Sequence, residues 1–186
     1  MDIRTWESRS TIRWGFNAAR RNAYFRATFG EAFPVETFNE MTREIFYQLK
    51  EKEGVPKKQG VDEILSYAKG AGYLLAVATS SRGPYSTELL KEAKIWQYFD
   101  AFVFGDMVTH AKPDPEIYLK ACEMLDVQPS EAAALEDSPN GIRAAYGAGM
   151  HPIVVPDLVQ PDEEIRSMCD WQCSSLLDVM EILKTQ

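Results

Sequence analysis

Several features that mark particular classes of protein are scarce in this sequence. It has three cysteines among 186 residues, Cys122, Cys169 and Cys173, which are too few and too irregularly spaced for a disulfide framework. No apolar run approaches the roughly 18 residues that a membrane-spanning helix needs. The N-terminal stretch is polar and charged and has no apolar signal-peptide core. We therefore expect reduced thiols, a cytoplasmic location and no membrane partner.

Positive charge is also in short supply. Twenty Lys and Arg residues stand against twenty-eight Asp and Glu residues, a formal net charge of −8, and no basic stripe occurs. Because nucleic acids and anionic membranes select clustered positive charge, neither is expected as the main partner. The sequence shows no internal repeat. Its 45% of hydrophobic residues suits one globular domain with at most a small appendage.

The N-terminal third is helical in character and carries no convincing strand. Apolar periodicity predicts one helix from Ala18 to Phe29 and another that begins at a Thr37 cap. The second helix carries an apolar stripe that we interpret as a packing face: Phe38, Met41, Ile45, Phe46 and Leu49. A stretch with Gly, Pro and Lys at 54–60 is the only plausible domain boundary.

From Val61 onward, helix and strand patterns alternate. Short apolar runs predict buried strands at 73–78, 101–104, 132–135 and 152–155. Helices are expected between these strands, and the last helix is expected to be capped by Ser174 or Ser175. This succession predicts an α/β fold with a doubly wound parallel sheet and right-handed crossovers.

Two adjacent acids end one of the predicted strands. The run at 132–135 leads into Glu136 and Asp137, and the turn at 138–141 opens a helix. Open α/β sheets bind ligands at the carboxyl ends of their strands, and a helix N-terminus adds backbone N–H groups there. Paired carboxylates suit Mg²⁺, which keeps coordination places for water and phosphate. Taken alone, however, the pair is more typical of an exposed strand end that caps the next helix.

Two further strand ends carry polar groups. Thr79 and Ser80 offer hydroxyl and turn N–H groups that can hold phosphate oxygens, although such a pair equally caps helices. Lys112 lies in HAKPDPE, where prolines stiffen the loop, and its point charge can neutralise a phosphate. Most loop lysines are simply solvated. Hydroxyls, a lysine and an acidic pair in this order, each after a strand, together favour a phosphate and Mg²⁺ site.

Three segments carry a resemblance to a known family. ATSSRG, AKPDPEIYLKA and LEDSPNGIRAAYGAG resemble the second, third and fourth motifs of the haloacid dehalogenase superfamily, closest to the helical-cap phosphatases and β-phosphoglucomutase. The similarity covers roughly residues 35–186 and implies a Mg²⁺-dependent enzyme acting on a small phosphorylated metabolite, with hydrolysis favoured over mutase chemistry. It also implies that residues 1–58 are the back half of a helical cap and that residues 59–186 are the α/β core.

The resemblance implies roles for individual residues. Lys112 and Thr79 are expected to be catalytic, because Thr79 would bind the transferring phosphoryl group and Lys112 would neutralise it. Asp137 is expected to bind Mg²⁺, with Glu136 bound directly or through water. The substrate-binding set that the resemblance implies is Thr79, Ser80, Ser81, Arg82 and Lys112.

One motif of the superfamily is missing. Members begin with an apolar strand and an Asp-x-Asp motif, which supplies the nucleophile and the general acid and base, and no Asp-x-Asp occurs in this sequence. Asp2 has no strand before it. We therefore expect the central strand, the front of the cap and phosphatase turnover to be absent, with open strand edges beside the gap. A shortened reading frame is the favoured explanation, and a non-catalytic phosphate- and Mg²⁺-binding protein, or a part of an assembly, is the alternative.

A receiver domain of the response-regulator type has a comparable sheet, but its acidic cluster follows the first strand, where this sequence has none. His110, His151 and the cysteines are expected to be bystanders, since a phosphoryl site already has its cations in a lysine and Mg²⁺. The sequence carries no signal for the substrate's identity or for the oligomeric state.

Overall fold

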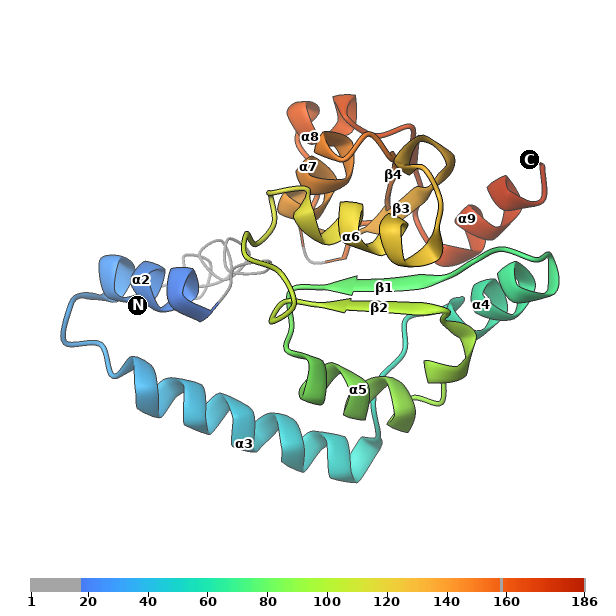
Figure 1. Cartoon of the computed structure of the whole chain (residues 1–186). Coiled ribbons are helices and arrows are strands. Elements are labelled where there is room, and N and C mark those ends of the chain that lie inside the picture. The colour runs from blue at the N-terminus through green and yellow to red at the C-terminus, as the bar shows by residue number, and fades with distance from the viewer. Residues whose placement is uncertain (1–17, 158, 186) are drawn as a thin grey trace. The chain divides into compact units, whose positions relative to one another are not determined.

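The computed structural model describes residues 18–157 and 159–185 (Figure 1). The chain divides into two compact units, Met1–Lys57 and Lys58–Gln186. The interpretations that concern Asp2 and its neighbours lie outside the described residues. No helix in the described ranges is long and apolar enough to cross a membrane.

The described part of the first unit consists of two helices, α2 (Ala18–Phe29) and α3 (Val35–Glu53). Phe25 of α2 is the centre of an aromatic cluster, with its ring centroid 5.6 Å from that of Phe33 and 5.1 Å from that of Phe38. Such ring pairs add to the stabilisation that comes from burial alone. This cluster joins the two helices that the sequence predicts here.

The helix α3 departs from its prediction in two ways. It begins at Val35 rather than after Thr37, and Pro34 precedes it without a side-chain cap. Phe38 packs as expected, but three members of the predicted packing stripe are more than half exposed: Met41, Ile45 and Leu49. Periodicity predicts that a face is apolar, but it does not say what covers that face.

The second unit alternates helices with strands that pair in parallel. In chain order it contains α4 (Val61–Gly70), β1 (Ala76–Thr79), α5 (Gly83–Glu92), the short turn η2 (Trp96–Tyr98), β2 (Ala101–Phe104), α6 (Glu116–Leu125), η3 (Pro129–Glu131), β3 (Ala133–Glu136), α7 (Pro139–Gly147), β4 (His151–Val154), α8 (Glu163–Ser167), β5 (Trp171–Gln172) and α9 (Leu176–Leu183). The predicted α/β class is therefore confirmed.

The strands form two parallel groups. Ala76 of β1 lies opposite Ala101 of β2, and in the other group β4 lies between β3 and β5. Among the described residues, β1 and β3 each have a strand neighbour on one side only. Each of them therefore has an open edge, as expected for a sheet of this type without its central strand.

Helices cover both faces of the three-stranded group. On one face, Ile153 of β4 packs with Ile64 of α4 and Val179 of α9. On the other face, Val154 packs with Ile142 of α7 and with α8. Figure 1 shows α5 and α6 on opposite sides of β1 and β2. This doubly wound layering buries both faces of parallel sheets, which is the usual condition for their stability.

Two strands differ from their predictions in position and burial. The strand β1 begins at Ala76 rather than at 73, and Tyr73 and Leu74 are exposed. In β3, Leu135 is 41% exposed although its register partner Ile153 is 1% exposed, because β3 has an open edge. The sequence did not predict α8 or β5, since elements of five and two residues carry little periodic signal.

The first helix of the second unit packs against its last helix. Gly60 precedes α4 with a φ of +89°, and a Cβ there would lie 3.1 Å from the side chain of Leu177 in α9. Of the two serines predicted as the cap of α9, Ser175 is the N-cap in the structure. Its hydroxyl accepts from the Asp178 N–H at 3.3 Å, and the Asp178 carboxylate accepts from the Ser175 N–H at 3.0 Å.

Candidate functional site

A buried lysine connects the open edges of the two strand groups. Lys112 Nζ donates to the Ala78 carbonyl oxygen of β1 at 3.1 Å and forms an ion pair with Glu136 at the end of β3. The Tyr118 hydroxyl of α6 lies 3.1 Å from the same Nζ and donates to the Glu136 carboxylate. The side chains of Lys112 and Glu136 are only 8% and 9% exposed. The structure thus brings together the predicted lysine, the first predicted acid and the strand that ends in Thr79.

Glu136 is enclosed by the turn that follows β3. The Ser138 hydroxyl donates to Glu136 Oε2 at 3.0 Å, and it accepts from the Gly141 N–H at 3.1 Å as the cap of α7. A Cβ at position 141 would lie 2.0 Å from the Glu136 carboxylate carbon. Glycine therefore allows the first turn of α7 to close over this side chain. Glu136 faces inward, and hydrogen-bond donors occupy both of its carboxylate oxygens.

Asp137 behaves differently from its neighbour because its side chain is exposed. No hydrogen bond from another described residue reaches its carboxylate. Partial loss of hydration and then the Glu136 charge raise the pKa of Asp137, and Lys58 opposes this shift. An accessible hard oxygen of this kind fits a divalent cation that binds few protein carboxylates and keeps water. Asp137, joined by Glu136 once that residue leaves Lys112, would hold Mg²⁺.

The loop after β1 is fixed against the end of β2. The Ser81 N–H donates to Thr79 Oγ1 at 3.2 Å, and the Gly105 N–H donates to the Ser81 carbonyl oxygen at 2.9 Å. A Cβ at position 105 would lie 2.2 Å from the Ser80 carbonyl oxygen, so the two loops touch through their backbones. Backbone N–H groups in a turn held this way are suited to phosphate oxygens.

The structure places the predicted residues at the carboxyl ends of the strands. Thr79 ends β1, Glu136 ends β3, and Lys112 reaches both strands from the loop between β2 and α6. Three predicted substrate-binding residues are exposed in the loop beyond Thr79: Ser80, Ser81 and Arg82. No described contact joins these three to the lysine, and their roles stay predictions.

Sequence reasoning missed Tyr118, which contacts both charges of the buried pair. Burial, followed by the Glu136 charge, raises the pKa of Tyr118 well above its usual range, so its hydroxyl keeps the proton that it donates. The available signal was its place in AKPDPEIYLKA, early in the helix that follows Lys112. Asp106 was missed as well, and its carboxylate accepts from the Gly83 N–H at 3.0 Å where α5 begins.

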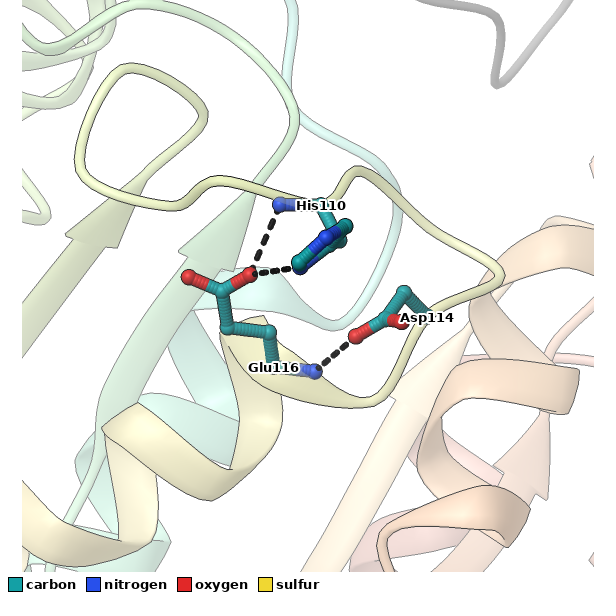
Figure 2. A group of neighbouring side chains, drawn as sticks. All are labelled: His110, Asp114 and Glu116. Carbon is teal, nitrogen blue, oxygen red and sulfur yellow. Dashed lines mark hydrogen bonds and ion pairs between the residues drawn. The ribbon is translucent and has the colours of Figure 1, made fainter.

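A second polar cluster anchors the loop that carries Lys112 (Figure 2). The Glu116 carboxylate accepts from the backbone N–H groups of Thr109 and His110, both at 2.7 Å, and His110 Nδ1 lies 2.9 Å from it. These two backbone bonds are the main reason why the pKa of Glu116 is lowered. Asp114 accepts from the Glu116 N–H at 3.0 Å. Because groups of the loop itself already occupy Glu116, the cluster holds the loop in place.

Comparison with known proteins gives the lineage of the chain. A family model described as haloacid dehalogenase-like hydrolase matches residues 16–155. CbbY of Cereibacter sphaeroides is 38% identical over 134 residues, which are 70% of this chain and 58% of CbbY. A phosphorylated carbohydrates phosphatase of Thermotoga maritima is 44% identical over 94 residues, which are 50% of this chain and 44% of that protein. The chain thus spans about half the length of these two relatives.

A solved structure agrees with the fold described above. The crystal structure of a CbbY variant from Rhodobacter sphaeroides, in complex with xylulose-(1,5)-bisphosphate, matches with a TM-score of 0.75 and 31% identity. The match covers 94% of this chain and 79% of that chain. The matched range also includes all three motif segments, the strands that end in Thr79 and Glu136, and the loop that carries Lys112. The chain therefore belongs to the haloacid dehalogenase-like hydrolase family.

Proposed function

We propose that this chain forms the phosphate- and Mg²⁺-binding part of a phosphatase that acts on a small phosphorylated metabolite, of the sugar phosphate class. The phosphorylated carbohydrates phosphatase and the bisphosphate-bound CbbY support the choice of substrate class. Hydrolysis is preferred to mutase chemistry, because the family resemblance is general and specific to no mutase. In this proposal residues 1–58 are the back of the substrate-selecting cap.

The observation that carries the proposal is the buried position of Lys112 between β1 and β3. A buried ammonium group requires an anionic partner; Glu136 is that partner in the structure, and a phosphoryl group beside Thr79 would take its place. Thr79 Oγ1 and the N–H groups of the loop after β1 would bind further phosphoryl oxygens. Ser80, Ser81 and Arg82 would contact the rest of the substrate. When bound at Asp137, Mg²⁺ would supply charge neutralisation for the phosphoryl group.

We infer that the 186 residues by themselves do not turn over phosphate esters. In the superfamily that the sequence resembles, an Asp carboxylate attacks phosphorus, and the sequence has no Asp-x-Asp motif to supply it. Within the described residues, no general base contacts Thr79, and the oxygens of Glu136 are occupied by donors. The same missing motif favours a second candidate function, a phosphate- and Mg²⁺-binding protein that acts without catalysis or within an assembly.

Phosphate binding tests the proposal directly. Calorimetric titration of the chain with inorganic phosphate, at a fixed Mg²⁺ concentration, is expected to show binding that weakens about tenfold or more in Lys112→Gln, since a hydrogen bond to a charged group is lost. Lys120→Gln is the matched control, because it removes the same charge from the same region and its Nζ contacts only the Met107 carbonyl oxygen among the described groups. Equal binding by the wild type and Lys112→Gln would contradict the proposal.

A further inference from the structure

We propose that the Lys112–Glu136 ion pair is a latch that makes phosphate binding and Mg²⁺ binding depend on each other. The inference rests on the proposed function, in which Lys112 binds phosphate and Glu136 joins Asp137 at the metal. The structure pairs these two side chains with each other, and they are buried together at 8% and 9% exposure. Neither is therefore free for its own ligand while the pair is closed.

The closed latch leaves no free hydrogen-bonding capacity on the lysine. An ammonium group has three N–H donors, and Lys112 Nζ has three partners: Ala78 O, Tyr118 Oη and Glu136 Oε1. A phosphate oxygen must take the place of one of them. Glu136 is the partner that phosphate replaces best, because it is the anion of the three.

The carboxylate is held in the same way. Glu136 Oε1 accepts from Lys112 and Tyr118, and Glu136 Oε2 accepts from Ser138. Mg²⁺ would compete with these donors for the oxygens. Asp137, in contrast, is exposed and outside the latch, so it can bind a cation first. Recruitment of Glu136 to that cation is the step that opens the pair.

Separation of Lys112 from Glu136 makes both side chains available, one for phosphate and the other for Mg²⁺. Phosphate that draws Lys112 away frees Glu136 for Mg²⁺, and Mg²⁺ that draws Glu136 away frees Lys112 for phosphate. The first ligand bears the cost of separating the pair and the second does not. Each ligand must then raise the affinity for the other by the same factor, because coupling between equilibria is reciprocal. Factors of about 5 to 150 are typical of such coupling, and we expect about tenfold here.

Calorimetry on the full chain measures this factor. Mg²⁺ is titrated with and without saturating inorganic phosphate, inorganic phosphate is titrated with and without Mg²⁺, and the heat of Mg²⁺–phosphate association in buffer is subtracted. The expected result is about tenfold tighter binding of either ion in the presence of the other. If both ions bind independently, the latch is wrong and the proposed function stands. If neither ion binds, both are wrong.

Direct attraction between the two bound ions would also couple them, so a charge-neutral variant is needed. Tyr118→Phe removes one hydrogen bond from Glu136 and loosens the latch. Each ion alone should then bind about threefold tighter or more, and the coupling factor should shrink. Lys58→Gln is the control, because it removes a positive charge that acts on Asp137 without touching the latch. It should leave the coupling factor unchanged.

Two outcomes would overturn the latch in this experiment. One is an unchanged coupling factor in Tyr118→Phe, which would assign the coupling to attraction between the ions. The other is weaker phosphate binding in that variant, which would make Tyr118 a support for phosphate-bound Lys112. The wild type offers a measurement that needs no folded variant. The side-chain ¹³C carboxylate resonance of Glu136 should move when phosphate is added without any Mg²⁺, and a resonance that stays in place overturns the latch.

Discussion

Removing one partner of the Lys112–Glu136 pair is expected to destabilise the chain strongly. In Lys112→Met the Glu136 carboxylate, which is 9% exposed in the wild type, keeps only the Tyr118 hydroxyl and the hydroxyl and N–H groups of Ser138 as donors. Breaking a buried ion pair from one side costs about 3–5 kcal/mol, because the remaining charge keeps its desolvation without its counter-charge. Glu136→Gln should cost less within this range, since Lys112 retains the Ala78 carbonyl oxygen and the Tyr118 hydroxyl.

The double variant Lys112→Met/Glu136→Gln separates the pair from general damage. It leaves no unpaired charge, so its loss of stability should be smaller than the sum of the single losses by about 2 kcal/mol, within the usual range for residues in contact. Urea unfolding followed by circular dichroism and tryptophan fluorescence at pH 7 gives each free energy of unfolding. Lys184→Met is the control, because Lys184 pairs with Glu181 at 41% and 66% exposure. It should cost less than about 1 kcal/mol. Losses of that small size in both buried variants would refute the reasoning.

Four further predictions address the metal, the chemistry, the loop contact and pH. Asp137→Asn should abolish calorimetric Mg²⁺ binding, which we expect to be weak in the wild type because few carboxylates remain, and equal binding would remove Asp137 from the site. The chain should not hydrolyse p-nitrophenyl phosphate in the presence of Mg²⁺, whereas a version extended by a relative's first strand and front cap should hydrolyse it. Steady turnover by the unextended chain that is lost in Lys112→Ala would reveal an unrecognised nucleophile. Gly105→Ala should lower the free energy of unfolding by about 1–3 kcal/mol in urea, since its Cβ would meet backbone 2.2 Å away, and an unchanged urea midpoint would count against this contact. The Asp170 carboxylate and then the Ser130 carbonyl oxygen raise the pKa of His151 above 6.5, so the stability that protonated His151 contributes is complete below about pH 6.5 and is lost as the pH rises through the raised pKa. In His151→Gln the urea midpoint should therefore fall less between pH 5.5 and pH 8.5 than in the wild type. Parallel plots of midpoint against pH for the two proteins would disprove this linkage.

Local signals predicted the parts of the structure that depend on neighbours in sequence. The helix predicted from Ala18 ends at Phe29 as expected, and the cap of α9 lies at one of the two predicted serines, Ser175. The order of strands and helices was sufficient for the α/β class. It also placed Thr79 and Glu136 at strand ends and Lys112 in a loop that follows a strand, because parallel strands present their carboxyl ends at one edge.

Long-range partners could not be predicted from the sequence. The apolar run ending in Leu135 has the composition of a buried strand, yet its burial depends on a neighbour that the described residues do not include. Glu136 and Asp137 form one acidic pair in the sequence, but Glu136 faces inward to Lys112 and Asp137 is exposed. Glu136 is held inward by Lys112 and by Tyr118 of α6, and the acidic pair itself gives no sign of these distant partners.

The packing of α4 against α9 has a consequence for how the second unit is made. Ile64 of α4 is covered in part by Val179 of α9, and nearly the whole second unit separates these two residues in sequence. Bringing such distant segments together costs loop-closure entropy and slows folding. During synthesis, β1, β2 and α6 can assemble early, whereas the apolar face of α4 stays uncovered until α9 has left the ribosome. A nascent chain stalled before residue 176 would therefore expose that face to chaperones and to other chains.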